Sequence, residues 1–222
     1  MAKTQKKLDR ELYGPSLFEV TFGALLSIAL GGILATGYLI AQPVESVRAL
    51  PREPDPDKVY YVKGSARSSL GGQWLRKKQL LTEEGSIQLE LNEDELNTWH
   101  SSSKAKSDSE ETPGIISAQE INFRISDDAL QVGVPCDFSV PGFAKSFVVQ
   151  ARGEFLSDGD RFNFEPKEVM IGQLAAHKLP LVGTFIMNRI FSAQEIPHDM
   201  EDAWDSLDEV KVQGDKILLV RR

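Results

Sequence analysis

The 222-residue sequence predicts an α+β fold in which an N-terminal transmembrane helix is followed by a curved antiparallel sheet wrapped on a long apolar helix. Residues 20–41 form an uninterrupted apolar run. Residues 115–172 alternate apolar and polar side chains, which is the period of half-buried antiparallel strands. Residues 179–191 are apolar on nearly all sides, and such a helix is normally buried.

The first element, residues 20–41, has 22 residues without a charge. At about 1.5 Å per residue it reaches roughly the 30 Å of a bilayer core. The alternative is a cleavable signal peptide, but Leu39 stands where its cleavage site requires a small residue. A retained single-pass anchor is therefore favoured.

The flanks of this run predict its orientation. Residues 1–19 carry four cations close to the span, Lys3, Lys6, Lys7 and Arg10. The positive-inside rule then places residues 1–19 in the cytoplasm. Residues 59–222 are expected to form a domain outside the cytoplasmic membrane.

Two polar stretches and the net charge describe the rest of the organisation. Residues 42–58 contain four prolines among charges, which predicts an extended linker. Residues 101–114 hold no aliphatic side chain larger than alanine, which predicts a flexible loop. From residue 42 onward, 21 Lys and Arg residues face 30 Asp and Glu residues, a net charge of −9. This argues against nucleic acid as a partner, because phosphate binding needs a concentrated basic face.

The domain begins with a predicted helix in "QWLRKKQLLTEEG", ended by Gly85, and a strand in "SIQLEL". Asn92 then serves as the N-cap of a second helix, with Glu95 at the third helical position, as in a capping box. Leu91 and Leu96 occupy the hydrophobic-staple positions.

The strands after residue 115 are separated by breaks at "SDD", "VPGFAK" and "LSDGD". These breaks fall at hairpin-like intervals and predict an antiparallel meander, with "EVMIG" as a further strand ending at Gly172. An amphipathic helix, "PHDMEDAWDSL", follows the apolar helix. Two strands, "EVKVQ" and "KILLV", hinged at Gly214-Asp215, close the chain.

Residue patterns for catalysis, metals or cofactors are not found in the sequence. His100, His177 and His198 have no second ligand at a metal-binding spacing, and surface or interface roles are favoured. The lone Cys136 is expected to be a buried small apolar residue. The acids at 93–95 are explained by capping and the helix dipole. We therefore expect a protein that is not an enzyme and that needs no cofactor.

Small residues recur every four positions in the transmembrane run, at Gly23, Ser27, Gly31 and Ala35. Such a stripe lets another helix approach closely and predicts packing with a partner helix or in a homodimer. The alternative is chance, since small residues are common in membrane spans.

The apolar helix at 179–191 has two interpretations. Its large side chains either fill the space inside the sheet, where each stabilises the fold by roughly 1.5–3 kcal/mol, or leave an apolar channel that acyl chains complete. Without further information the filled interior is favoured.

The segments "IQLELNEDELNTW", "VMIGQLAAHKLPLVGTFI" and "LDEVKVQGDKILLV", together with the single anchor and the meander, form a pattern. This pattern resembles the extracytoplasmic YpmS-like proteins of bacteria, which are similar to tubular lipid-binding domains. The resemblance implies a bent sheet around a helix, a membrane lipid as the partner, and no catalytic residues.

The leading functional prediction is a membrane-anchored domain that binds or shields a lipid-like amphipathic ligand. The alternative is a non-catalytic structural or assembly subunit of a membrane protein complex, docking through its transmembrane helix. The predicted ligand-lining residues are Phe123, Val132, Phe147, Phe164, Ile171, Val182, Phe185, Ile186 and Ile190.

Overall fold

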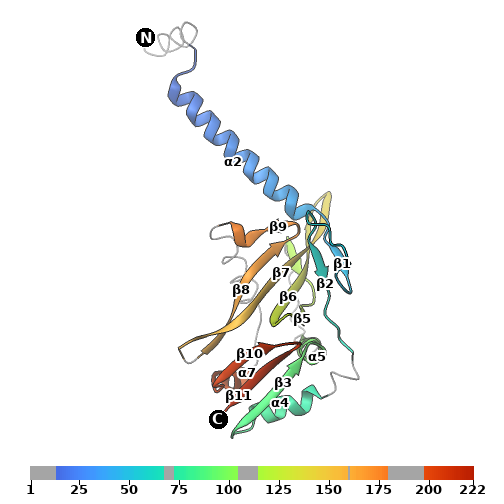
Figure 1. Ribbon diagram of the computed structural model, residues 1–222. Coiled ribbons are helices and arrows are strands. Elements are labelled where there is room, and N and C mark those ends of the chain that lie inside the picture. The colour runs from blue at the N-terminus through green and yellow to red at the C-terminus, as the bar shows by residue number, and fades with distance from the viewer. Residues whose placement is uncertain (1–13, 68–72, 105–114, 160, 180–197) are drawn as a thin grey trace. The chain divides into compact units, whose positions relative to one another are not determined.

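The computed structural model describes residues 14–67, 73–104, 115–159, 161–179 and 198–222 (Figure 1). The chain divides into an N-terminal unit, residues 1–40, and a second unit, residues 41–222. Together they make an α+β protein with an N-terminal apolar helix and antiparallel sheets, which confirms the coarse fold class.

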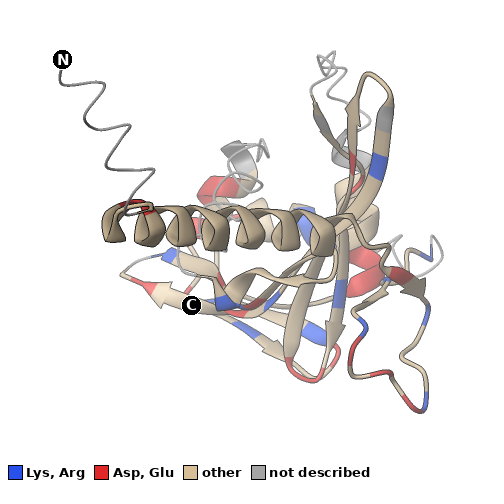
Figure 2. Cartoon of the chain, turned by 90° about the horizontal axis from the view of Figure 1, so that it is seen from above, with Lys and Arg blue, Asp and Glu red and all other residues tan. Residues whose placement is uncertain are grey.

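The N-terminal unit holds one long apolar helix, α2 (Leu17–Ala41), of 25 residues. At 1.5 Å per residue its length is about 37 Å, enough to cross the core of a bilayer. No other helix among the described residues is long and apolar enough to do so. The ribbon of this helix is almost free of charged residues in Figure 2. The predicted membrane span is thus confirmed in length and composition, starting three residues earlier than expected.

A capping box begins α2 and explains its only acid. The Glu19 backbone N–H donates to Ser16 Oγ at 3.2 Å, and the Ser16 backbone N–H donates to Glu19 Oε2 at 3.1 Å. Two otherwise unpaired donors of the first turn are satisfied in this way. Glu19 therefore has a local structural role at the start of the helix.

Part of the predicted linker 42–58 is folded. Strand β1 (Glu45–Val47) pairs in parallel with β2 (Tyr60–Val62). The carbonyl of Pro43 accepts a hydrogen bond from Gln173 Nε2 at 3.1 Å. Composition did not predict this strand, because a three-residue strand shows no period and prolines surround it.

The largest sheet is the antiparallel meander that the sequence predicts. Its strand order is β4-β6-β7-β8-β9, and β5 also pairs with β6. The separate strand predicted in "EVMIG" is wrong, because these residues continue β8 past a register shift opposite Arg152 and Gly153. A bulge at this point bends the pair without ending it. The strands are β4 (Ile116–Ala118), β5 (Asn122–Ser126), β6 (Ala129–Val140), β7 (Phe143–Asp158), β8 (Arg161–Ile171) and β9 (Leu174–Ala175). A short 3-10 helix, Ala176–Lys178, follows β9.

The turn between β5 and β6 consists of Asp127 and Asp128, both in the left-handed region with φ of 52° and 56°. Two such residues form the hairpin turn whose twist matches the strands, and aspartate tolerates this conformation better than most residues. Asp128 Oδ1 also accepts a hydrogen bond from the Gly214 N–H at 2.6 Å, which joins this turn to the turn of the last hairpin.

A second sheet has the strand order β10-β11-β3. In the sequence, α4 precedes β3, α5 follows β3, and α7 precedes β10. The final hairpin is confirmed, but its pairing with β3, where Leu91 lies opposite Ile217, was not predicted. Arg221 at the end of β11 donates to the carbonyls of Leu81 and Gly85, so it caps the C-terminal end of α4. The elements are α4 (Trp74–Thr82), β3 (Ile87–Asn92), α5 (Glu93–Lys104), α7 (His198–Asp205), β10 (Glu209–Gln213) and β11 (Lys216–Arg221).

The helices largely agree with their sequence signals. Asn92 Oδ1 accepts from the Glu95 N–H at 2.9 Å and Glu95 Oε2 accepts from the Asn92 N–H at 3.0 Å, which confirms the capping box. Met200, Ala203 and Leu207 are buried, which confirms the amphipathic face of α7 and the turn after it.

Two predictions concern segments that are only partly described. The first four residues of the loop predicted at 101–114 belong to α5 instead, and residues 105–114 lie outside the described residues. Of the apolar helix predicted at 179–191, only Leu179 is described. A sheet wrapped around that helix therefore stays a prediction.

One face of the meander is crossed by residues 59–65, which we call the strap. Val59 N–H donates to Gln173 Oε1 at 2.7 Å, beside the β8–β9 turn. The ring of Tyr61 lies where a side chain at Gly133 of β6 would stand, so only glycine fits there. Gly64 N–H donates to Asn122 Oδ1 on β5 at 2.6 Å. These contacts fall on different strands, so the strap runs across the sheet.

The strap buries a phenol without a hydrogen bond. Tyr61 is 3% exposed, and its Oη has no hydrogen-bond partner among the described residues. Burial raises the pKa of Tyr61 to about 12, because the phenolate would lose its hydration. The unfolded chain ionises this phenol near pH 10, so its contribution to stability is present below pH 10 and is lost as the pH rises towards 12.

We expect Tyr61→Phe to leave the free energy of unfolding at pH 7 unchanged or raise it by up to about 1 kcal/mol, because it removes an unpaired buried hydroxyl. The same variant should lose less stability than the parent between pH 10 and pH 12, as measured by urea denaturation. Tyr60→Phe is the matched control, since Tyr60 Oη accepts a hydrogen bond from the Asp55 N–H. A larger loss at pH 7 for Tyr61→Phe than for Tyr60→Phe would contradict this account.

Candidate functional site

The meander brings five of the predicted ligand-lining residues to one face. Phe123 lies opposite Val132, and Val132 lies opposite Ala151. Cross-strand partners share a face and side chains alternate along each strand, so Phe147 joins this set through Ala151. Ile171 lies opposite Val149, and Phe164 lies opposite Phe155, both on the same side. We call this side the apolar face; the strap crosses the other side.

The middle of the apolar face is closed. Val132 is 4% exposed and Ile171 is 3% exposed, and their neighbours Val149 and Val169 are also buried. By contrast, Phe123, Phe147 and Phe164 are half-buried. Strand β10 contacts β6 and β7, and α7 contacts β8. The central side chains therefore act as core, and of the five predicted residues only the three phenylalanines keep accessible surface.

Two of these aromatic rings contact other rings of the same chain. Phe164 packs edge to face on Phe155, with ring centroids 5.9 Å apart, and Phe155 packs on Trp204 of α7 at 5.4 Å. Trp204 Nε1 donates to the carbonyl of Phe162 at 2.9 Å, which fixes the indole beside β8. Phe123 packs edge to face on His100 at 6.0 Å. Their first role is thus internal packing.

Two depressions that described residues line are both open, and neither is an apolar channel. One, of about 280 Å³, is lined by charged residues that include Asp127, Arg152 and Lys167. The other, of about 380 Å³, lies at the β7–β8 hairpin and includes only Phe164 of the predicted lining. The remaining predicted residues, Val182, Phe185, Ile186 and Ile190, lie outside the described residues.

The predicted helix-packing stripe is open along α2. Gly23, Ser27, Gly31 and Ala35 are all exposed in this unit. A Cβ atom added at Gly23 or Gly31 would meet nothing within 4 Å. Ser27 Oγ donates to the Gly23 carbonyl at 2.9 Å, so the hydroxyl is satisfied within its own helix.

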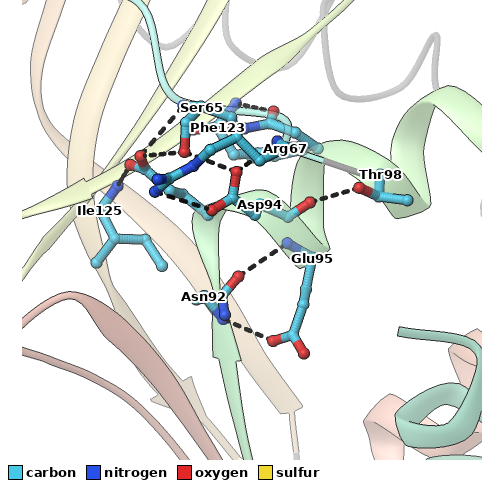
Figure 3. A network of polar contacts seen from close by, with 10 residues as sticks. Ser65, Arg67, Asn92, Asp94, Glu95, Thr98, Phe123 and Ile125 are labelled. Atoms are coloured by element: carbon cyan, nitrogen blue, oxygen red, sulfur yellow. Dashed lines mark hydrogen bonds and ion pairs between the residues drawn. The ribbon is translucent and has the colours of Figure 1, made fainter. Parts of the chain in front are cut away.

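A buried amide network, missed by the sequence analysis, joins α5, β5 and the strap (Figure 3). Asn97 is 5% exposed, and its Nδ2 donates to the carbonyls of Ser65 at 2.9 Å and Phe123 at 2.7 Å. Its Oδ1 accepts from the Phe123 N–H at 2.7 Å and from Asn122 Nδ2 at 3.2 Å. The backbone N–H and carbonyl of Phe123 are thus both hydrogen-bonded by the Asn97 side chain, in the way that a neighbouring strand would bond them.

The acids at the start of α5 accept hydrogen bonds from distant residues, in addition to interacting with the helix dipole. Ser65 Oγ donates to Glu93 Oε1 at 2.9 Å and to Asp94 Oδ1 at 2.7 Å. Asp94 Oδ1 also accepts from the Arg67 N–H at 2.6 Å, and Asp94 is 4% exposed (Figure 3). Only Glu95 is explained by capping, and it also pairs with Lys77 at 2.7 Å. No local signal could reveal this, because the partners are 27–32 residues apart.

The other residues singled out from the sequence take structural positions. Cys136 is 5% exposed, as predicted, and burial raises the pKa of its thiol to about 11. His177 Nδ1 lies 3.0 Å from the carbonyl oxygen of Val169. The side chain of His198 lies outside the part of the chain that the structure describes. Among the described residues, no three His, Cys, Asp or Glu side chains are grouped so as to hold a metal ion.

We expect Asn97→Ala to lower the free energy of unfolding by about 2–4 kcal/mol, because buried backbone groups of Ser65 and Phe123 lose their partners. Denaturant unfolding measures the loss, and hydrogen exchange should show faster exchange of the Phe123 amide. The exposed Asn163 provides the control, where substitution by alanine should change stability by less than about 0.5 kcal/mol. Equal effects at Asn97 and Asn163 would rule out this role for the network.

Comparison of the chain with protein-family models, with curated proteins and with solved structures gave no match. The resemblance to YpmS-like proteins and tubular lipid-binding domains therefore stays a prediction.

Proposed function

We propose that this chain is a membrane-anchored, non-catalytic domain that binds or shields a lipid-like amphipathic ligand against the apolar face of its meander. One observation carries the proposal. Phe123, Val132, Phe147, Phe164 and Ile171 were selected from the sequence as apolar lining, and they come from four strands to a single face. Membrane lipid is the ligand class that this chemistry favours, and the domain lies on the extracytoplasmic side of a bacterial membrane.

The distribution of polar groups along the apolar face supports this ligand class. On β7 the face runs from Lys145 through Phe147, Val149 and Ala151 to Ser157, so polar side chains stand only at its two ends. An acyl chain requires continuous apolar contact, whereas its headgroup requires water or charge. The half-buried phenylalanines at the border of the closed core offer apolar contact to the acyl chain. The polar ends of the face offer water and charge to the headgroup.

A lipid with a photoreactive acyl chain tests the proposal in the full chain reconstituted into nanodiscs. After irradiation and digestion, we expect adducts on β7 and β8 in addition to those on α2. Phe147→Ser should reduce the adducts on β7 and β8 by about tenfold if the ring supplies roughly 1.4 kcal/mol of contact.

Val148→Ser is the matched control for this experiment. Val148 is half-buried like Phe147 but points to the opposite side of the sheet. It should therefore keep the adducts of the parent. Adducts confined to α2, or a folded Phe147→Ser variant with undiminished labelling of β8, would refute ligand binding on this face.

A second candidate function is favoured by the open stripe on α2. All four small residues are exposed, and nothing in this unit covers the space beside Gly23 and Gly31. A helix of a partner protein, or of a second copy of this chain, fits such a surface. In that case the chain is a non-catalytic assembly subunit that docks through its membrane helix.

Gly31→Leu should weaken this helix pairing about tenfold, because the larger side chain separates the backbones and costs on the order of 1.4 kcal/mol. Energy transfer between labelled chains in nanodiscs measures the pairing for a homodimer, and co-purification measures it for a partner protein. Gly37→Leu serves as the control, since Gly37 lies away from the stripe on the helix. If both substitutions leave pairing unchanged, the stripe is not an interface.

A further inference from the structure

The hairpin turns of this domain differ in charge according to the end of the sheet at which they lie. In a meander, the β5–β6 and β7–β8 turns lie at one end and the β6–β7 and β8–β9 turns at the other. Asp127 and Asp128 stand at the first end, and Asp215 joins them because the Gly214 N–H of its turn donates to Asp128 Oδ1. At the same end Asp158 of β7 lies opposite Arg161 of β8. The turns at the second end, 141–142 and 172–173, carry no charge.

The β6–β7 hairpin at this second end is apolar as well as uncharged. Residues 138–144 read "FSVPGFA". Pro141 and Gly142 form the exposed turn, with Gly142 at φ 83°, and Val140 beside them is only half-buried. Ile115, which is 62% exposed, is held next to this hairpin because its carbonyl accepts from the Ser139 N–H at 2.9 Å. Apolar surface is thus gathered at the tip and beside it.

The chain itself limits how far this end of the sheet is from the end of the apolar helix. The carbonyl of Pro43 accepts a hydrogen bond from Gln173 Nε2. Pro43 is two residues after Ala41, the last residue of α2, so the covalent chain allows at most about 7 Å between these two residues. Gly172 N–H donates to the carbonyl of Val148 at 2.9 Å. From Val148 to the β6–β7 turn is six residues, or about 20 Å along β7. The opposite end of β7 is about 33 Å away.

We propose that the β6–β7 hairpin is a second membrane contact of this chain, with residues 139–144 in the interfacial layer of the bilayer that α2 enters. This proposal does not depend on ligand binding by the apolar face. Apolar side chains gain by leaving water for the interface, which lies about 5–10 Å deep. The aspartates of the opposite turns are repelled by anionic lipid, so both ends of the sheet favour the same direction.

Charged residues on the same hairpin limit the depth of this contact. Lys145 follows the uncharged segment and is exposed, which suits the phosphates of lipid headgroups. Asp137 precedes it and is held by Ser146 Oγ at 2.6 Å and Gln119 Nε2 at 2.7 Å. Between these charges only three residues of β6 and two of β7 are uncharged, or roughly 7–10 Å of strand. The hairpin therefore touches the interface and does not cross the bilayer.

A fluorescent probe on the full chain in nanodiscs of mixed neutral and anionic lipid tests this contact. An environment-sensitive maleimide is attached to the Ala144→Cys variant, and quenching by lipids with doxyl-labelled acyl chains is measured. The native Cys136 interferes little, because it is 5% exposed and its thiol has a pKa raised to about 11. We expect at least threefold stronger quenching for Ala144→Cys than for Ser157→Cys, whose probe sits beside the opposite turn.

A second substitution makes the test independent of the probe. Pro141→Asp places a charge in the exposed turn and should reduce quenching at the Ala144→Cys position at least twofold, whereas Gln213→Asp, exposed beside the β10–β11 turn, should not change it. Circular dichroism confirms that both variants are folded. Equal quenching at Ala144→Cys and Ser157→Cys, or quenching that Pro141→Asp leaves unchanged, overturns the proposal.

Discussion

The buried side-chain amide of Asn97 is the interaction on which the arrangement of this domain depends. It binds both backbone groups of Phe123 in β5 and the carbonyl of Ser65 in the strap, and it stands on α5, which follows directly after β3 of the second sheet. Each such hydrogen bond adds only about 1 kcal/mol net, but loss of the amide leaves several buried groups unpaired at once. One residue thus ties the two sheets and the strap together.

The strap gives the two faces of the meander different chemistry. On the polar face, the Gly64 N–H donates to the side-chain amide oxygen of Asn122. The ring of Tyr61 packs on the same face at Gly133, where there is no side chain. The apolar face is left to β10 and α7, which contact β6, β7 and β8. The polar face is thus occupied by the chain's own residues 59–65.

The ends of the meander differ as strongly as its faces. Aspartates stand in the turns at one end, where Asp127 pairs with Arg152, whereas the Pro141-Gly142 turn carries apolar neighbours and no charge. Such a separation of charge along the strands gives the sheet a direction relative to any lipid surface, independently of how α2 is oriented. Pro43, whose carbonyl accepts a hydrogen bond from Gln173, is only two residues after the end of α2.

Local signals in the sequence determined the apolar helix α2, the capping box at Asn92, the hairpin turns and the buried face of α7, because each depends on residues within one or two turns of the chain. The same local alternation places Phe123, Val132, Phe147 and Ile171 on one face, once antiparallel pairing is granted. Phe164 is seven residues from Ile171 on β8 and shares this face only because of the register shift opposite Arg152 and Gly153. Only the tertiary structure decided that β3 pairs with β11, that β1 and the strap fold back, and that Asn97 and Asp94 act together. These contacts join residues 15 to more than 100 positions apart, where a side chain's type does not reveal its partner. The central side chains of the apolar face are buried, and β10 and α7, which are distant in sequence, contact the strands that carry them.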